Sequence, residues 1–289
     1  MVALLLGGLL AAGVRVPGAA LARSVLARIV CAVSLGDACA GPGSLAAAYG
    51  EDLARLVRRH APNIAYEEGM RALPVDYRRC RRPDCADGAE EGIVAASYRR
   101  QPVAAFVHVV DCREGAPPAM ADCSGERAGN LYLQYFFYYP DSATLRGVPY
   151  AGDRGFHRHD WESLQVRIGP DGEADSRASS HNGYNHRSGI RNWGSDSGIG
   201  PLKAAAEALG ARSPGGWGDA SGWLFVSGGS HAGSVLGSPS SLGRVTPRHR
   251  LRLIPLEPIA VADPPRYFGW VTPPWLKAVW FDPEAEGTS

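Results

Sequence analysis

Apolar and polar residues alternate along several short stretches of this chain, as they do in strands with one buried face. The clearest stretch begins at Asp160. Every second residue of this stretch lies on one face: Asp160, Glu162, Leu164, Val166 and Ile168. The residues between them, from Trp161 to Arg167, then lie on the other face. Turns rich in glycine and proline separate stretches of this kind, so the pattern predicts a protein built mainly from strands.

The same reasoning predicts further strands at 103–111, 131–139, 174–181, 223–227 and 251–257. The stretch 131–139 carries aromatic residues on both faces, which predicts a central strand covered on both sides. The turn Gly169-Pro170-Asp171-Gly172 joins 161–168 to 174–181 as a hairpin. A helix capped by Ser44 is expected to run to about His60, and a short one to cover 201–209.

These elements predict a mainly β fold with peripheral helices, and the best match is an antiparallel β-sandwich. We expect a signal peptide or anchor at 1–22, a helical and disulfide-stapled region at 23–100, and a β-sandwich core with a cation site at 101–289. The tail 272–283 carries Trp275 and Trp280 and is expected to lie across the body of the molecule.

The N-terminal stretch Val2 to Val14 is apolar, uncharged and too short to span a bilayer. It is typical of the apolar region of a signal peptide, and Ala20-Leu21-Ala22 offers small residues for cleavage. No Lys or Arg precedes it, so an N-terminal anchor is the alternative. Either reading predicts a secreted or extracellular protein.

The six cysteines fall into three close pairs, which predict the disulfides Cys31–Cys39, Cys80–Cys85 and Cys112–Cys123. Their spacing does not match a zinc site, and reduced buried thiols are the alternative. The formal net charge is only +1, and no basic tract is interleaved with aromatic residues. Nucleic acid is therefore not an expected partner.

The run Phe156-His157-Arg158-His159-Asp160-Trp161-Glu162 concentrates groups that carry chemistry. Asp160 and Glu162 share the face that is apolar further along the strand, where ionised carboxylates are costly unless they are paired or bound to a cation. A cation held by both carboxylates and a nearby imidazole would remove that cost. The alternative is a local salt bridge to Arg158 together with ordinary buried histidines.

Three blocks resemble the signature motifs of the necrosis- and ethylene-inducing-like protein family. They are Tyr138-Tyr139-Pro140-Asp141, His157 to Glu162, and Ser179-Ser180-His181-Asn182-Gly183-Tyr184. The resemblance covers about 130–184, whereas the first 100 residues are more similar to a branch of secreted actinobacterial proteins. It implies a secreted β-sandwich with a divalent cation at one end, and many such proteins are cytolysins that dock on plant sphingolipid head groups.

Carried over residue by residue, the resemblance implies cation binding by Asp141, His157, Asp160 and Glu162. It places His181 near the acidic cavity in which the family holds this cation. The link from Asp141 to His157 is longer than in the family, so Asp153 is a rival for Asp141 as the upstream ligand. Phe156 also stands where the family has glycine.

The donor set is rich in oxygen, which suits Ca²⁺ or Mg²⁺, with Mn²⁺ as a further candidate, better than Zn²⁺. His159 adjoins Asp160 and is expected to point away from it. We interpret it as a hydrogen-bonded histidine of the core, or as one that supports the cation ligands without binding the cation. Arg158 either pairs with a carboxylate or holds a ligand phosphate. His181 is expected to line the cavity.

The segment Gly228-Gly229-Ser230-His231-Ala232 nearly matches a nucleophile elbow, but it ends in alanine and no clear helix follows. We interpret it as a tight turn from which His231 could still reach the cavity. The sequence therefore predicts a secreted cation-dependent protein that binds a polar head group or glycan, with a membrane surface as a further candidate partner. A metal-dependent hydrolase, with His157 or His181 moving a proton, and a cation-stabilised structural protein are the alternatives.

Overall fold

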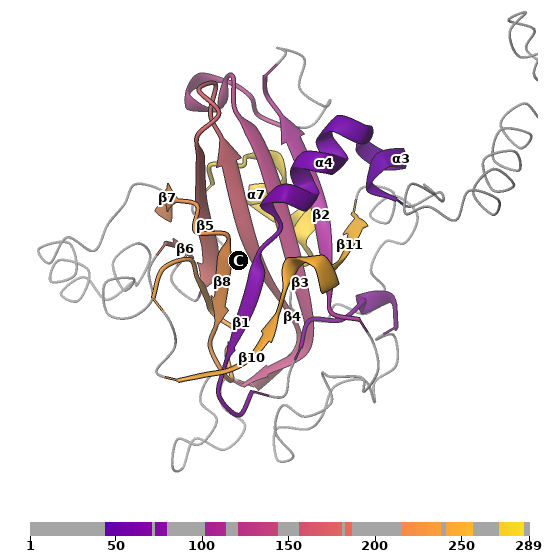
Figure 1. Ribbon diagram of the computed structural model, residues 1–289, viewed down its shortest axis with the longest axis vertical. Helices are drawn as coiled ribbons and strands as arrows, with labels where there is room; N and C mark the ends of the chain where they lie inside the picture. The colour runs from indigo at the N-terminus through magenta and orange to yellow at the C-terminus, as the bar shows by residue number, and fades with distance from the viewer. Residues whose placement is uncertain are drawn as a thin grey trace, which may run out of the picture.

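The protein is mainly β, with two sheets arranged like a sandwich and a few short helices (Figure 1). The computed structural model describes residues 44–70, 73–79, 102–113, 121–143, 156–180, 183–186, 216–237, 241–256 and 272–285. The predicted strands lie close to their expected positions. The helix expected at 201–209 lies outside the described residues.

The larger sheet is built around two 13-residue strands, β3 (Leu131–Ala143) and β4 (Phe156–Ile168). Its strand order is β11-β2-β3-β4-β5-β6, and β7 pairs with β5. The other strands are β2 (Ala104–Asp111), β5 (Ala174–Ser180), β6 (Gly183–Asn185), β7 (Gly218–Asp219) and β11 (Arg252–Pro255). The aromatic strand β3 lies inside the sheet, as its two apolar faces predict.

The smaller sheet has the order β10-β1-β8-β9. Its strands are β1 (Asn63–Glu67), β8 (Trp223–Val226), β9 (Gly233–Ser234) and β10 (Leu242–Thr246). The chain N-terminal to residue 101 thus supplies a strand, β1, to the sandwich. Two pairs, β1 with β8 and β11 with β2, are parallel, so the sandwich is mixed and not purely antiparallel.

The main core lies between the two sheets. It combines Tyr139, Leu164 and Val166 of the larger sheet with Ile64 and Leu224 of the smaller one. The face of β4 that carries Asp160 and Glu162 is therefore the face turned toward the second sheet. Two helices also pack on this core, α3 (Leu45–Tyr49) and α4 (Glu51–His60). Ser44 caps α3 as expected, but Gly50, at a positive φ of 83°, divides the single helix that was predicted.

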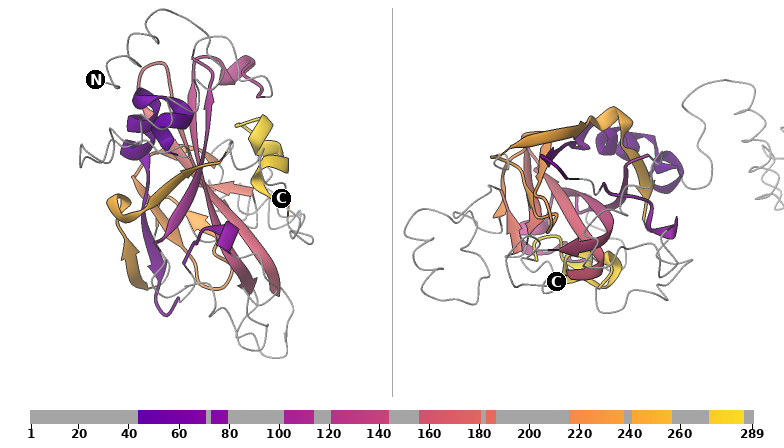
Figure 2. Two further views of the ribbon diagram at one scale, coloured as in Figure 1. Left: turned by 90° about the vertical axis from the view of Figure 1, so that its right-hand side faces the viewer. Right: turned by 90° about the horizontal axis from the view of Figure 1, so that it is seen from below.

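The opposite face of the larger sheet is covered by the C-terminal segment, as predicted for the tail. In Figure 2, α4 and this yellow segment lie on opposite sides of the long strands. The segment contains the 3₁₀ helix η7 (Pro274–Leu276) and α7 (Ala278–Phe281), and it buries Trp275 and Trp280 in a second core. Tyr77 of η1 (Tyr77–Arg79) also joins this second core.

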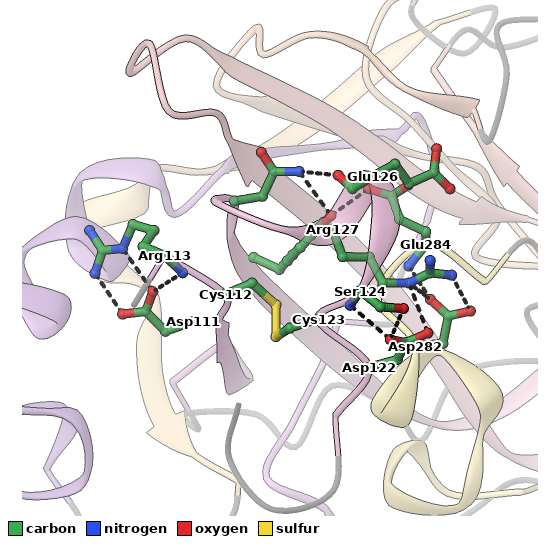
Figure 3. The surroundings of a disulfide bond; sticks show 12 residues. Asp111, Cys112, Arg113, Asp122, Cys123, Ser124, Glu126, Arg127, Asp282 and Glu284 are labelled. Carbon is green, nitrogen blue, oxygen red and sulfur yellow. Dashed lines mark hydrogen bonds and ion pairs between the residues drawn. A yellow bond between two sulfur atoms is a disulfide. The ribbon is translucent and has the colours of Figure 1, made fainter. Parts of the chain in front are cut away.

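The predicted disulfide Cys112–Cys123 is confirmed (Figure 3). It closes the loop between β2 and β3, beside the 3₁₀ helix η3 (Gly125–Arg127). Arg127 donates to both carboxylate oxygens of Asp282, at 2.6 and 2.7 Å, and so ties this loop to the C-terminal segment. The other two predicted pairs, Cys31–Cys39 and Cys80–Cys85, lie outside the described residues. Among the helices that are described, none is long and apolar enough to cross a membrane.

Candidate functional site

The carboxylates singled out by the sequence lie near the start of β4, on the interior face of the larger sheet. Asp160 is directly opposite Tyr139 of β3 in the sheet register, and Glu162 is opposite Phe137. Both aromatic residues belong to the main core, so the two carboxylates continue an apolar face. The Asp160 side chain is almost fully buried, so its carboxylate is costly unless nearby groups pair with it.

Asp160 meets His231 across the space between the sheets. Its Oδ2 lies 2.7 Å from Nδ1 of His231, which comes from the turn between β8 and β9. The His231 ring stacks on Tyr139 with the two ring centroids 3.9 Å apart. Within the described residues, its Nε2 is buried and has no hydrogen-bond partner. A carboxylate thus orients an imidazole whose second nitrogen has unused hydrogen-bonding or metal-binding capacity.

Two histidines of this site have a left-handed backbone. His159 has a φ of 62° and His231 a φ of 57°, and no other described non-glycine residue has a positive φ. Such conformations are uncommon outside glycine and are enriched at functional sites. Their location in one small region therefore marks it as a candidate site independently of its charges.

The left-handed residue at His159 accounts for the position of His157. In a regular strand, residues 157 and 160 would lie on opposite faces of the sheet. Here Nε2 of His157 lies 4.0 Å from Oδ1 of Asp160. His159 itself points to the other face, where its Nδ1 lies 2.7 Å from the hydroxyl of Tyr138. The structure thus brings His157 toward Asp160 and directs His159 away from it.

Glu162 occupies a position that disfavours its charge. Burial, together with the nearby Asp160 carboxylate, raises the pKa of Glu162 well above its ordinary value, although a hydrogen bond from Ser179 opposes this. Ser179 Oγ donates to Oε2 of Glu162 at 2.5 Å and accepts from the backbone N–H of Ser163. The site therefore holds two acidic groups that repel each other where water is scarce.

Lys277, which precedes α7, is a basic residue whose charge acts on these carboxylates. Burial lowers the pKa of Lys277, while Glu162 and Asp160 act in the opposite direction. The same ammonium group lowers the pKa of Glu162. The C-terminal segment thus contributes one positive charge toward a pair of carboxylates.

The remaining predicted site residues are located only in part. Asp141 is fully buried on β3 and lies opposite Arg158 of β4, so the matched residue is adjacent to the motif in the sheet. The side chain of Arg158 lies outside what the structure describes, as do His181 and Asp153. Neither the choice between Asp141 and Asp153 nor the place of His181 is therefore decided.

The predicted metal centre is not preassembled in the described part of the chain. No three described His, Cys, Asp or Glu side chains are grouped so that they could hold a metal ion together. The chemistry of the donors, carboxylate oxygens with a nearby imidazole, still suits a hard cation that keeps most of its water shell. A cation near Asp160 would therefore have few direct protein ligands and would keep most of its water.

Sequence reasoning named His231 only as a residue that could reach the cavity, and it did not single out Lys277 or Ser179. The turn at 228–232 did carry a signal, because glycines around a serine and a histidine indicate an unusual backbone. Lys277 carried none, since it belongs to a segment distant in sequence and is brought in by the packing of Trp275 and Trp280.

Comparisons with known proteins add no assignment. No family model matches the chain, and neither a curated protein nor a solved structure is significantly similar to it.

Proposed function

We propose that this protein binds a polar head group or glycan with the help of a divalent cation, Ca²⁺ or Mg²⁺, at the Asp160–Glu162 end of the sandwich. The observation that carries this proposal is the pair of carboxylates on the interior face of β4. Burial and then the Asp160 carboxylate raise the pKa of Glu162, so ionising both carboxylates is costly, and a bound cation would relieve that cost. This secreted, necrosis-inducing-like type of protein is the one that the motif resemblance implies.

A cation held by few protein groups suits a binding role. Mg²⁺ usually keeps several waters and uses one or two carboxylates, and Ca²⁺ accepts six to eight oxygen ligands. A ligand oxygen can then replace a water, while His157 and His231 hold neighbouring polar groups. His231 supports this role because its Nε2 has no partner among the described residues.

Binding of the cation is tested by calorimetric titration of the chelator-treated protein with Ca²⁺, Mg²⁺ and Mn²⁺. We expect one site that is lost in Asp160→Asn and weakened in Glu162→Gln. Lys277→Gln is the informative counterpart, because it removes a competing positive charge and should tighten cation binding. Absence of binding in the native protein, with Lys277→Gln equally inert, would exclude the cation.

Ligand binding is tested with lipid and glycan arrays probed with and without chelator. We expect signals that need both the cation and Glu162. A signal that persists in EDTA and in Glu162→Gln would show that the ligand is bound elsewhere or without metal.

The Asp160–His231 pair favours a second candidate, a metal-dependent hydrolase. A histidine oriented by a carboxylate, with its other nitrogen buried and without a hydrogen-bond partner among the described residues, has the arrangement of a general base. It would take a proton from a water polarised by the cation. Turnover of a phosphodiester or glycoside that exceeds a metal-free control and is lost in His231→Asn would establish the hydrolase over the binding protein.

A further inference from the structure

The outer face of the smaller sheet carries exposed apolar side chains. Ala65 of β1 pairs with Val245 of β10 on one side and Phe225 of β8 on the other, so these three share a face. Ile64 points into the core, so Phe225 and Val245 lie on the opposite, outer face, while Ala65 between them is itself covered, with 1% of its surface exposed. Trp223 contacts Phe225 on this face and is 37% exposed, and Val245 is 46% exposed.

Four arginines come from two segments that meet beside the first residues of β1 and β8. Arg58 and Arg59 lie in the last turn of α4, while Arg248 and Arg250 belong to the 3₁₀ helix η6 (Arg248–Arg250) between β10 and β11. Arg248 joins the two segments, because its Nη1 donates to the backbone carbonyl of Arg59 at 2.6 Å. Figure 2 shows the orange segment of β10 and η6 passing beside the indigo α4.

These four arginines have no carboxylate partner within the described residues. Other arginines of the chain form ion pairs, namely Arg55 with Asp52, Arg113 with Asp111 and Arg127 with Asp282. The crowding of positive charge is also visible at His60, where burial and then Arg59 and Arg248 lower the pKa of the imidazole. The formal net charge of the whole chain is only +1, so this charge is local.

Arg248 connects the arginines to the apolar side chains at the start of β8. The backbone N–H of Asn63 donates to the carbonyl of Gly222, and a Cβ added at Gly222 would lie 2.8 Å from Nη2 of Arg248. Trp223 follows directly and pairs with Asn63. We call this surface the basic–apolar face. Its members are Arg58, Arg59, Arg248, Arg250, Trp223, Phe225 and Val245.

We propose that the basic–apolar face docks on a membrane surface that contains anionic phospholipids. Guanidinium groups suit lipid phosphates, and exposed Trp is favoured at the membrane–water boundary. A soluble polyanion would use the arginines but would gain little from Val245, so the apolar side chains favour a lipid surface.

This docking surface is separate from the candidate site. β1 and β8 run parallel, and the basic–apolar face adjoins their first residues, Asn63 and Trp223. His231 follows the last residue of β8, at the other end of the strand. Docking through this face therefore does not depend on a cation bound near Asp160.

The test is flotation of the full chain with vesicles of phosphatidylcholine alone or of phosphatidylcholine with 30% phosphatidylserine, in EDTA and at low and high salt. We expect binding to the anionic vesicles at low salt, little binding to the neutral ones, and loss at high salt. Arg58→Gln and Arg250→Gln should each weaken binding about fivefold, since each charge near such a surface contributes about that factor.

Matched variants distinguish binding through this face from a general effect of charge or hydrophobicity on vesicle binding. Arg113→Gln removes one charge just after the last residue of β2, which belongs to the larger sheet, and should leave vesicle binding unchanged. Trp223→Gln should weaken vesicle binding severalfold, whereas Phe281→Gln, which replaces an aromatic residue 38% exposed elsewhere, should not. Melting curves of all variants identify any that fail to fold, and Arg58→Gln, at an exposed helix position, is the variant expected to fold normally.

Three results would overturn the proposal. The first is absence of binding to anionic vesicles, and the second is equal binding to neutral ones. The third is binding to soluble heparin that needs Arg58 and Arg250, with vesicle binding that is insensitive to Trp223→Gln. That result would assign the face to a polyanion.

Discussion

Asp160 and His231 are 71 positions apart in the chain, yet their side chains meet at 2.7 Å and join the two sheets at one end of the sandwich. Asp160 lies on β4 of the larger sheet and His231 in the turn between β8 and β9 of the smaller one, so their contact depends on how the two sheets pack. Hydrogen bonds to charged groups contribute more to stability than neutral ones, and a buried carboxylate that loses its donor carries a desolvation penalty. This contact therefore links the architecture of the protein to its candidate site.

The stability of the sandwich should fall when His231 is replaced. We expect His231→Asn to lower the free energy of unfolding by about 1–3 kcal/mol, because Asp160 then loses a buried donor. Asparagine tolerates the positive φ at this position, so backbone strain is not the cause. Urea denaturation measures the effect. In a double-mutant cycle with Asp160→Asn, the two changes should be clearly non-additive, and additive losses would contradict a direct coupling.

Removal of divalent cations should lower the melting temperature. A cation at one hundred times its dissociation constant stabilises the folded state by about 2.7 kcal/mol. For a protein of this size EDTA should then lower the melting temperature by about 5–10 °C. Asp160→Asn should melt at the same temperature with and without EDTA, whatever its own stability after the change in its contact with His231. Unchanged melting of the native protein, with no metal found by elemental analysis, would refute the cation.

Most of the larger sheet could be predicted because its strands carry their signal locally. The face of β4 is marked by a period of two residues, and β3 by aromatic residues on both faces. The strands β1 and β10 were not predicted. β1 follows a helix after two residues, and four of the five residues of β10 are exposed, so neither strand shows a regular alternation.

The two carboxylates of the candidate site could be predicted from the sequence, whereas the residues that contact them could not. Asp160 and Glu162 stand on an apolar face, which the sequence pattern alone reveals. His157 reaches Asp160 only because His159 adopts a left-handed backbone, and no residue pattern demanded that conformation. His231 and Lys277 come from distant segments, and such contacts are set by tertiary packing.

Loss of the Cys112–Cys123 disulfide should destabilise the protein moderately. The cross-link closes a short loop, and the chain-entropy model gives about 2–3 kcal/mol for a loop of this length. Cys112→Ala with Cys123→Ala should lower the free energy of unfolding by this amount. The ties between Arg127 and Asp282 should keep the loop in place, so the fold should persist. Loss of the native circular dichroism spectrum in the double variant would contradict a purely stabilising role.

Peptide mapping without reduction should find the two other predicted pairs, Cys31–Cys39 and Cys80–Cys85. The expectation rests on their short separation and on the confirmed pairing of Cys112 with Cys123. Free thiols at these positions in the purified protein, or long-range pairing, would contradict it.

The stability of the folded state should fall as the pH is lowered from 6.5 to 4, because of His108. Its ring is buried, stacks on Trp280 with centroids 3.6 Å apart, and has Nδ1 2.8 Å from Oε1 of Gln134. Burial is the main cause that lowers the pKa of His108 to about 4. The unfolded chain, with an ordinary value of 6.5, therefore binds a proton over this range that the folded state does not bind.

The contribution of His108 is fully present above pH 6.5 and is lost progressively below it. The difference between pH 7 and pH 4 is roughly 3 kcal/mol for this one group. Urea denaturation over this range should show the loss, superimposed on that of other groups. His108→Phe keeps a ring against Trp280 and cannot titrate, so its stability should depend less steeply on pH even if its absolute stability is lower. Equal slopes for the native protein and the variant would show that His108 is protonated in the folded state, and that the stacked ring does not exclude the proton.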